Sequence, residues 1–394
     1  MTMPDARCAV LLGAWTLLVA GVTGCDRTPD AGALRLSLLE TLGGDTAGYL
    51  RAAVLRTFDF PTDYGSHPGF RTEWWYVTGS LSSEDGRDFG FQFTIFRNAL
   101  SPEHPGGPSE WSTNQAYMGH FALTDVEGEQ FRAEERFARG AAGLAGATSD
   151  PFKVWIEDWV LESADVTGAT PETFPLRLVA RGEGMALELS LEAGKPLVLQ
   201  GDRGLSRKGP QPGNASYYYS RTRMPAAGRL VLGSDTVDVD GLAWLDREWS
   251  TSSLSEGQVG WDWFALQLDD GWEIMIYRLR RTDGSVDRWS AGVLIDPAGN
   301  RIQLEWGPDV VLETTGSWTS PVDGASYPSG WRLRVPSRGW DLAVDPAIVD
   351  QELDLAFRYW EGSVRVRGRG EGGRPVTGRG YVELTGYAGL VPAR

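Results

Sequence analysis

The chain has 394 residues, of which 53 are Asp or Glu and 37 are Lys or Arg, so its formal net charge is −16 at pH 7. This acidity excludes a typical nucleic-acid-binding protein, because phosphate contacts need a basic face. The 17 Trp, 12 Tyr and 14 Phe exclude a disordered chain, and the 50 Gly exclude a helical bundle. The length fits about two domains, each large enough to bury its own core.

The first 25 residues have the pattern of a secretion signal. Residues 9–22 are apolar except for scattered Gly and Thr, and this stretch is shorter than the roughly 20 residues of a membrane span. It ends in Val22-Thr23-Gly24-Cys25, which is similar to the bacterial lipobox, where cleavage precedes a lipid-modified Cys. We therefore predict a lipoprotein signal peptide over residues 1–24 and a lipid anchor on Cys25. The alternative is an ordinary secretory signal followed by a chance Cys.

A lipid anchor predicts that the protein is located in the bacterial cell envelope, on the periplasmic or extracytoplasmic face of a membrane. Two acyl chains hold a protein on a bilayer stably, whereas one chain does not. Asp26 is similar to the inner-membrane retention signal of enteric bacteria, so the inner membrane is favoured. Because Cys8 leaves with the signal peptide, no Cys remains for a disulfide, a nucleophile or a thiolate metal site.

Strands dominate the pattern that follows. Residues 25–56 are expected to be a spacer with one short helix, since Leu34, Leu38 and Leu42 have a helical spacing that Gly43-Gly44 ends. After the spacer, short alternating runs are separated by Gly, Asp, Asn or Pro, and this pattern predicts an all-β sandwich or barrel class. Examples of these runs are residues 74–81, 89–97, 118–124, 176–180, 186–192, 230–239, 261–268, 272–280, 364–368 and 380–384.

A turn cluster at Gln211-Pro212-Gly213-Asn214 predicts a boundary between two β-domains, at residues 57–212 and 213–394. Each half contains a Trp-rich strand that carries a carboxylate and is followed by a hairpin. We interpret this shared pattern as a weak internal duplication. The two strands contain Glu73-Trp74-Trp75-Tyr76 and Trp261-Asp262-Trp263.

The first candidate cluster lies in the segment from His67 to Gly79. On a strand, Glu73 and Trp75 face one way, and Trp74 and Tyr76 face the other. A carboxylate beside Trp rings is either paired or kept protonated. Two roles for Glu73 therefore stay open: it binds an Arg or backbone amides at the domain junction, or it is an acid in an apolar pocket.

The second cluster is Trp244, Asp246 and Glu248, which share one strand face. Two neighbouring carboxyl groups can split their pKa values, which leaves one protonated near neutrality, as a general acid for an alkene requires. The alternative is that Asp246 and Glu248 form salt bridges with Arg221, Arg223 or Arg278.

The third cluster is Tyr217, Tyr219, Arg221 and Arg223, which also share a strand face. These side chains would line a pocket and neutralise the carboxylates of the second cluster, or they would form an amphipathic edge strand.

Motifs for other chemistries are missing from the sequence. The three histidines, His67, His104 and His120, lack metal-ligand spacing, so we predict no metal and no other cofactor. The sequence also lacks a GxSxG elbow, a P-loop and a strand-linked GxGxxG, which leaves hydrolase, kinase and dehydrogenase functions without support.

Five motifs in chain order resemble the AttH-like, carotenoid 1,2-hydratase-like family of lipocalin-like proteins, which includes hydroxyneurosporene synthase. The resemblance covers the chain from about Phe58 to its C-terminus and implies two tandem lipocalin-like (calycin) antiparallel β-barrels packed together. The motifs are His67-Pro68-Gly69-Phe70-Arg71-Thr72-Glu73-Trp74-Trp75-Tyr76-Val77-Thr78-Gly79, Gly119-His120-Phe121-Ala122-Leu123-Thr124-Asp125, Tyr217-Tyr218-Tyr219-Ser220, Trp244-Leu245-Asp246-Arg247-Glu248-Trp249 and Gly260-Trp261-Asp262-Trp263-Phe264.

The resemblance implies more than one function. Hydroxyneurosporene synthase adds water to a terminal isoprenoid double bond without a cofactor, related fungal proteins are pericyclases, and the AttH branch carries a lipoprotein signal and is associated with MacB/FtsX-type ABC permeases. The Asp of the hydratase Tyr-x-Asp motif is matched by Asp246, but Trp244 stands at the Tyr position. Arg247-Glu248-Trp249 replaces the expected His-Asn-Trp, and these departures together with the lipobox favour the AttH branch.

We therefore predict a lipid-anchored protein that binds an apolar ligand such as a lipid or isoprenoid, because aromatic-lined barrels suit such ligands, as an accessory to an ABC transport system. The alternatives are a cofactor-free hydratase or isomerase that acts on a polyene, and a scaffold with filled barrels. The enzyme would use Asp246 as acid, Glu248 as its pKa partner and Tyr219 for orientation. The predicted ligand-binding residues are His67, Glu73, Trp75, Trp244, Tyr217, Arg221, Trp261 and Trp263.

Overall fold

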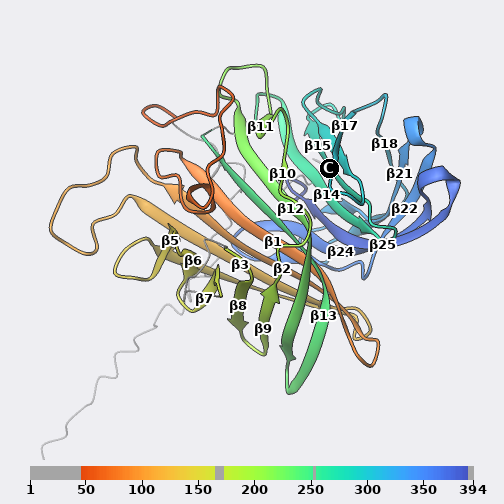
Figure 1. The fold of residues 1–394 in the computed structure, drawn as a ribbon, viewed down its shortest axis with the longest axis horizontal. Helices are drawn as coiled ribbons and strands as arrows, with labels where there is room; N and C mark the ends of the chain where they lie inside the picture. Colours follow the sequence, from red (N-terminus) through yellow and green to blue (C-terminus); the bar gives the residue numbers. More distant parts are fainter. Residues whose placement is uncertain (1–45, 165–172, 252–253, 389–394) are drawn as a thin grey trace, which may run out of the picture. The chain divides into compact units, whose positions relative to one another are not determined.

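The computed structural model describes residues 46–164, 173–251 and 254–388. Its regular elements in these ranges are strands and three short 3₁₀ helices, so the predicted all-β class is confirmed (Figure 1). The 3₁₀ helices are η1 (Thr62–Tyr64), η2 (Pro336–Arg338) and η3 (Glu371–Gly373). The predicted signal peptide, Cys25 and the short helix near Leu38 lie outside the described residues.

The first sheet is antiparallel and curls into a nearly closed barrel. Its strand order is β4-β3-β2-β1-β13-β12-β9-β8-β7-β6-β5, and two short strands, β10 and β11, pair with β12. The strands are β1 (Thr72–Ser83), β2 (Asp88–Ala99), β3 (Gln115–Asp125), β4 (Gln130–Arg139), β5 (Ala145–Ser149), β6 (Phe152–Ile156), β7 (Trp159–Ser163), β8 (Leu176–Gly182), β9 (Met185–Leu191), β10 (Val198–Leu199), β11 (Leu205–Arg207), β12 (Ala215–Leu232) and β13 (Asp235–Ser250).

The second sheet forms a half-barrel with the order β17-β16-β15-β14-β25-β24-β22-β21-β18, and β23 pairs with β24. Its strands are β14 (Gln258–Leu268), β15 (Glu273–Arg281), β16 (Ala291–Ile295), β17 (Arg301–Glu305), β18 (Val311–Thr314), β21 (Trp331–Val335), β22 (Trp340–Pro346), β23 (Glu352–Asp354), β24 (Arg358–Arg369) and β25 (Pro375–Leu384). A separate hairpin joins β19 (Ser317–Thr319) to β20 (Ser326–Pro328).

Both sheets wind in the same way. In each sheet the first four strands are neighbours in chain order, β1 to β4 and β14 to β17. The first strand of each sheet also pairs with the last long strand of that sheet: β1 with β13, and β14 with β25. This is the tandem lipocalin-like arrangement that the sequence predicted. The shared winding is also what the proposed internal duplication would produce.

The boundary between the two sheets lies later in the chain than the predicted boundary at 212/213. Both β12 and β13 follow that position, yet they belong to the first sheet, and the second sheet begins with β14 at Gln258. The turn at Gly213 is real and has a positive φ of 79°. It reverses the chain within one sheet, because β11 before the turn pairs antiparallel with β12 after it.

Part of the predicted spacer packs against the first sheet. Ala52 is fully buried in the first core, and the Tyr217 hydroxyl donates a hydrogen bond of 2.8 Å to the carbonyl of Val54. Arg56 forms a salt bridge of 2.7 Å with Asp63. Residues 46–56 are therefore part of the folded body.

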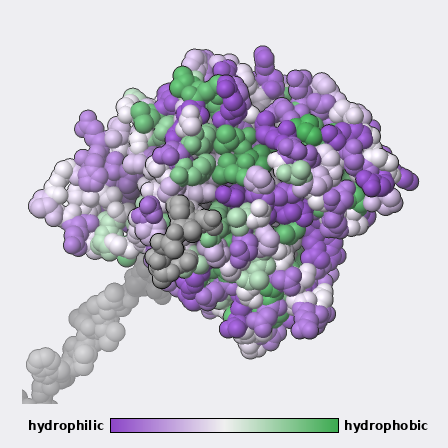
Figure 2. All heavy atoms as spheres, viewed as in Figure 1, coloured by the Kyte–Doolittle hydropathy of each residue, from purple (hydrophilic) through white to green (hydrophobic). Residues whose placement is uncertain are grey.

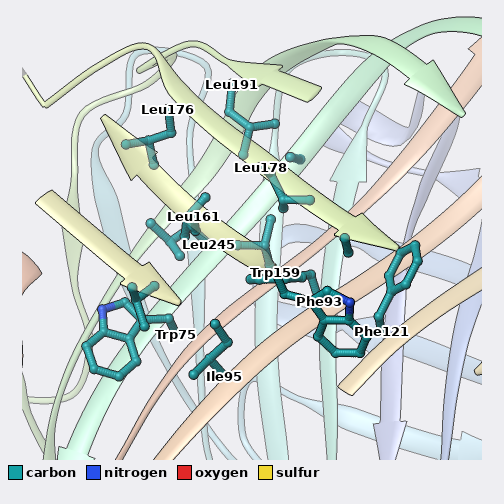
Figure 3. Close-up of a cluster of buried hydrophobic side chains, with 14 of the residues drawn as sticks. Trp75, Phe93, Ile95, Phe121, Trp159, Leu161, Leu176, Leu178, Leu191 and Leu245 are labelled. Carbon is teal, nitrogen blue, oxygen red and sulfur yellow. The ribbon is translucent and has the colours of Figure 1, made fainter. Parts of the chain in front are cut away.

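Side-chain alternation explains how the first barrel is filled. In β9, Met185, Leu187, Leu189 and Leu191 are buried, whereas the residues between them are partly or fully exposed. Figure 3 shows other side chains of this core, in which Phe93, Phe121 and Trp159 lie close together. The interior of the first barrel is thus a packed core.

The residues of β13 from Ala243 to Ser250 are buried without alternation. One face of this part of β13 belongs to the first core, through Leu245 and Trp249, and the other face packs with residues of the second sheet, through Trp244. A strand covered on both faces is buried continuously. We call the layer between the two sheets the seam. The face in Figure 2 is mostly hydrophilic, with one group of hydrophobic residues near its upper centre.

Candidate functional site: a carboxyl-lined cavity in the seam

A cavity of about 130 Å³ lies in the seam. Its buried inner wall includes Tyr76, Asp246 and Trp263, whereas Trp74 and Leu254 are partly exposed and mark the mouth. The lining residues are Thr72, Trp74, Tyr76, Phe96, Lys208, Ser216, Tyr218, Asp246, Glu248, Ser250, Leu254, Trp261, Trp263, Tyr277, Leu279, Tyr359 and Glu383. Strands of both sheets contribute, so the cavity exists only where the two sheets meet.

Asp246 is held in the cavity wall by three hydrogen-bond donors. The Tyr218 hydroxyl donates to Oδ2 at 2.5 Å, the Ser220 hydroxyl donates to Oδ1 at 2.5 Å, and the indole of Trp244 donates to Oδ1 at 2.7 Å. Strand pairing places Ser220 directly opposite Asp246 on β12. These donors fix the orientation of the carboxyl group and leave it without a cationic partner.

The missing cation distinguishes Asp246 from most buried acids of this protein. Among the described residues, ten Asp and Glu side chains are buried, and eight of them form salt bridges. The two without a salt bridge are Asp246 and Glu361, and both have side chains in the seam. The eight paired residues are Asp63, Glu73, Asp125, Glu248, Asp262, Glu273, Asp287 and Glu352.

Burial raises the pKa of Asp246 to about 7, against the opposing effect of the hydrogen bonds from Ser220, Tyr218 and Trp244, and the nearby Glu248 raises it further. A charged carboxylate in an apolar site costs free energy unless a cation compensates it, so the neutral acid is favoured here. At neutral pH, Asp246 is therefore able both to give and to accept a proton.

Glu248 has a different environment from Asp246. Its Oε1 atom lies 3.6 Å from the Lys208 ammonium, and that ammonium also lies 3.9 Å from the ring centroid of Tyr277. Burial lowers the pKa of Lys208, but the charge of Glu248, the neighbouring Tyr277 and the hydrogen bonds to both together outweigh this effect and leave the pKa raised. Lys208 is therefore the partner of Glu248, in place of the three arginines considered from the sequence.

The opposite wall of the cavity comes from the second sheet. Trp261 and Trp263 lie on β14, and Glu383 lies on β25 directly opposite Trp263. The Trp261 indole donates to Glu383 at 3.1 Å, and the Trp263 indole donates to the Tyr218 hydroxyl at 3.3 Å. Both predicted Trp residues of this strand thus reach the site.

The structure does not bring the third sequence cluster to Asp246. Tyr217 and Tyr219 belong to the first core, and Tyr219 donates to the carbonyl of Asp63 at 3.1 Å. Arg221 donates to the Tyr64 hydroxyl at 2.9 Å. This corrects the predicted placement, because β12 turns the even-numbered Tyr218 and Ser220 toward the seam and the odd-numbered residues away from it.

His67, Glu73 and Trp75 also lie away from the cavity, on the other side of β1. Glu73 is fully buried and forms salt bridges with Arg97 and Arg247, while its carboxylate accepts hydrogen bonds from the His67 amide. Burial raises the pKa of Glu73, but Arg247, Arg97 and His67 together outweigh this effect and hold the pKa well below its usual range. Of the two roles left open for Glu73, the structural one is the one found.

The aromatic rings around Glu73 complete this structural cluster. His67 stacks on Trp249 with ring centroids 3.8 Å apart, and the Arg247 guanidinium lies 3.9 Å from the ring centroid of Trp75. A second cluster of the same kind exists in the other sheet, where Arg278 and Arg280 bind the buried Asp262. The carboxylates of both Trp-rich strands are thus ion-paired.

Sequence reasoning missed Tyr218, Ser220, Lys208 and Glu383. For Tyr218 and Ser220 the signal was present, since both lie inside a recognised motif and only the choice of strand face was wrong. Glu383 is 137 positions from Asp246 in the chain, and only the pairing of β25 with β14 brings it to the cavity. No local pattern marks it.

Two further searches covered the described residues. Within them, no group of three or more His, Cys, Asp or Glu side chains has the arrangement of a metal site. None of the helices in the same ranges combines the length and the apolar composition needed to cross a bilayer.

The comparisons with known proteins agree with this architecture. The model of the AttH-like family matches residues 51–387. A solved structure provisionally assigned as AttH from Nitrosomonas europaea is 35% identical, with a TM-score of 0.73, and the match covers 85% of this chain and 98% of that one. Kievitone hydratase from Nectria haematococca has the same fold at 13% identity and a TM-score of 0.65, covering 90% of this chain and 97% of that one. A search of curated proteins found no significant match.

Proposed function

We propose that this chain, which belongs to the AttH-like family, is a cofactor-free hydratase or isomerase that protonates a carbon–carbon double bond of an apolar substrate in the seam cavity. The observation that carries the proposal is Asp246, a buried carboxyl group that has three hydrogen-bond donors and no salt bridge. A buried acid without a cation is a proton donor available at neutral pH.

The reaction follows from the chemistry of that carboxyl group. The O–H bond of Asp246 breaks as its proton forms a new C–H bond with the alkene, and the other alkene carbon becomes a cation. A water molecule then forms a C–O bond with this carbon and loses a proton, and Asp246 regains a proton before the next turnover. In an isomerase the cation instead loses a proton from a neighbouring carbon. Either way, no redox partner is needed.

The cavity wall supports both charges that appear in this step. The hydroxyl groups of Tyr218 and Ser220 and the indole of Trp244 stabilise the Asp246 carboxylate as it forms. The indole rings of Trp261 and Trp263 are part of the lining, and aromatic faces attract cations. Water enters through the mouth, where the side chain of Lys208 is partly exposed.

The size of the cavity limits what can react there. Its volume of about 130 Å³ is close to that of cavities that hold a single benzene ring, roughly 150 Å³. Only the reacting end of a larger substrate would therefore be enclosed. An apolar row could hold the remainder: strand pairing places Trp74, Phe96, Met118 and Phe137 side by side across four strands, and Phe137 is half-exposed.

Isotope incorporation tests the proposal directly. The purified protein is incubated in D₂O with geraniol, farnesol or lycopene, and the recovered alkenes and alcohols are analysed by mass spectrometry. We expect deuterium in the product of the wild-type protein and a loss of at least 100-fold in Asp246→Asn. Deuterium incorporation that persists in Asp246→Asn would overturn the proposal. The likeness to kievitone hydratase would not rescue it, because that likeness shows the fold alone.

A second candidate is a lipid-anchored binding protein that serves an ABC permease. The mainly aromatic lining of the cavity and the lipobox at Cys25 favour it. A binding protein would hold its ligand unaltered, so the same experiment separates the two functions. Ligand recovered by mass spectrometry from native protein, without deuterium incorporation and with equal retention in Asp246→Asn, supports binding alone.

A further inference from the structure

Two carboxyl groups of the second sheet lie side by side in the seam. Glu361 on β24 and Glu383 on β25 are direct cross-strand partners, and Glu383 also faces Trp263 on β14. Like charges placed directly opposite each other on neighbouring strands destabilise a sheet. A pair of this kind persists when at least one member is neutral.

Glu361 is the more enclosed member. Its exposed fraction is 0%, its Oε1 atom accepts a hydrogen bond from Tyr76 on β1, and its Oε2 atom has no hydrogen-bond partner among the described residues. It is the second of the two buried acids that lack a salt bridge in the described chain. One neutral hydroxyl does not compensate a buried negative charge, so Glu361 is the member that stays protonated.

Glu383 is the member that can exchange a proton with a ligand. It is partly exposed in the cavity, on the wall opposite Asp246, and it accepts a hydrogen bond of 3.1 Å from the indole of Trp261. Because Glu361 is neutral, Glu383 ionises without a charged cross-strand partner, and the carboxyl groups of Glu248 and Asp246 are the ones that oppose its ionisation.

We propose that Glu383 is a second catalytic acid–base group of the seam cavity, and that Glu361 is a neutral positioning residue behind it. This inference rests on the proposed function of Asp246. It adds that the substrate lies between two carboxyl groups, one from each sheet, so that protonation and deprotonation take place on opposite sides of the substrate.

The proton balance is closed. Asp246 gives its proton to one alkene carbon, and the Glu383 carboxylate takes a proton from the water that forms the C–O bond, or from the neighbouring carbon in an isomerisation. After product release, Asp246 regains a proton and Glu383 loses one to solvent at the mouth. No further reactant takes part.

The pH dependence follows from the groups around the pair. Burial raises the pKa of Glu383 to about 8, against the effect of the Trp261 hydrogen bond, and burial holds the pKa of Glu361 well above its usual range. The reaction needs Asp246 protonated and Glu383 ionised. The rate is therefore a bell-shaped function of pH, centred between about pH 7 and 8. The other titratable groups facing the cavity or this pair are Glu248, Lys208, Tyr76, Tyr218, Tyr277, Tyr359, Tyr381 and His120.

Infrared spectroscopy tests the pair without a substrate. Protonated carboxyl groups have a carbonyl stretching band that carboxylates lack, and this band is followed from pH 5 to pH 9. We expect Glu361→Gln to remove a band that persists across this range, and Glu383→Gln to remove one that titrates near pH 8. Glu313→Gln, at an exposed salt bridge with Arg334, is the matched control and should remove neither.

Turnover tests the catalytic role. With geraniol, farnesol and lycopene in D₂O, we expect Glu383→Gln to lower kcat about 100-fold and to remove one limb of the bell, with KM little changed. A wild-type rate and pH profile in Glu383→Gln would overturn this inference and leave Asp246 in place. Carboxylate bands alone at pH 7 would overturn this inference together with the neutral acid proposed at Asp246. A wild-type protein that turns over no probe would instead overturn the proposed function, and the catalytic role of Glu383 with it.

Discussion

At Asp246, the details of hydrogen bonding decide which protonation state is stable. Trp244 can only donate, and it shares Oδ1 with the Ser220 hydroxyl, so that oxygen is an acceptor in either state. Oδ2 faces the Tyr218 hydroxyl, which can donate or accept. A protonated Oδ2 can therefore donate to the Tyr218 oxygen, and the amide of an Asn side chain can make the same set of contacts.

Asp246→Asn should consequently change stability in a pH-dependent way. The folded-state pKa of Asp246 is about 7, above the ordinary value of 3.8, so the neutral carboxyl contributes most at low pH and its contribution is lost as the pH rises through 7. Urea unfolding at pH 5 and pH 8 should show the variant gaining roughly 3 kcal/mol relative to wild type over this interval. Asp341→Asn, at an exposed salt bridge with Arg332, should gain nothing comparable.

Tyr218 and Tyr219 provide a matched pair of variants. Tyr218→Phe removes a hydrogen bond to Asp246, so the pH profile of deuterium incorporation should move to higher pH as the acid becomes harder to ionise. Tyr219→Phe removes a hydrogen bond to the carbonyl of Asp63 in the first core, and should cost about 1 kcal/mol of stability without moving the profile. The reverse result would restore the role that the sequence suggested for Tyr219.

At the scale of elements, β13 shows how one strand serves two purposes. Its even-numbered residues Asp246 and Glu248 face the seam, while Leu245, Arg247 and Trp249 face the first core. The two carboxyl residues of the cavity are therefore flanked in the chain by residues that pack in the first core. A change on one face is felt on the other through the shared backbone.

The arginine on the inner face of β13 should be costly to remove. Arg247→Met leaves the fully buried Glu73 with Arg97 as its remaining arginine, and breaking a buried ion pair costs about 3–5 kcal/mol. Arg332→Met, at an exposed pair with Asp341, should cost less than about 1 kcal/mol. Urea unfolding measures both; equal losses would show that Arg247 is not a structural residue of this core.

For the whole molecule, the arrangement separates stability from function. The packed core of the first barrel includes Trp75, Phe93 and Trp159 (Figure 3), whereas the cavity is confined to the seam between the sheets. A cavity is therefore present in the seam, while the interior of the first barrel is filled. Because each sheet has its own core, substitutions in the seam can change the cavity while both cores stay packed.

The proposed membrane anchor is a property of the whole chain and has a simple test. Cys25→Ala should move the protein from the membrane fraction to the soluble fraction, because the diacylglycerol attachment site is lost. Cys8→Ala is the matched control, since that residue would be removed with the signal peptide and should leave the distribution unchanged. Immunoblotting of fractionated cells distinguishes the two, and membrane retention of Cys25→Ala would refute the lipobox.

Local patterns predicted much of the fold. The hairpin turn at Asp269-Asp270-Gly271 joins β14 to β15, with Gly271 at a φ of 89°, and its composition is typical of such turns. The run at residues 186–192 likewise forms most of β9, which alternates as a half-buried strand should. The placement of the sheet boundary failed, because a turn within a sheet and a turn between sheets have the same composition. At Gly213, strand pairing decides between the two kinds of turn: β12, after the turn, pairs with β9, before it, so the turn lies within one sheet.

The sequence by itself determined the all-β class, the family and the candidate acid Asp246, because strand periodicity and short motifs are local properties of the chain. The tertiary structure decided which strand face meets the second sheet, and therefore that Tyr218 rather than Tyr219 contacts Asp246. It also decided which carboxyl groups are left without a cation, since the partner of each buried charge comes from distant parts of the chain. A period of two tells which residues share a face, but long-range packing decides what that face contacts.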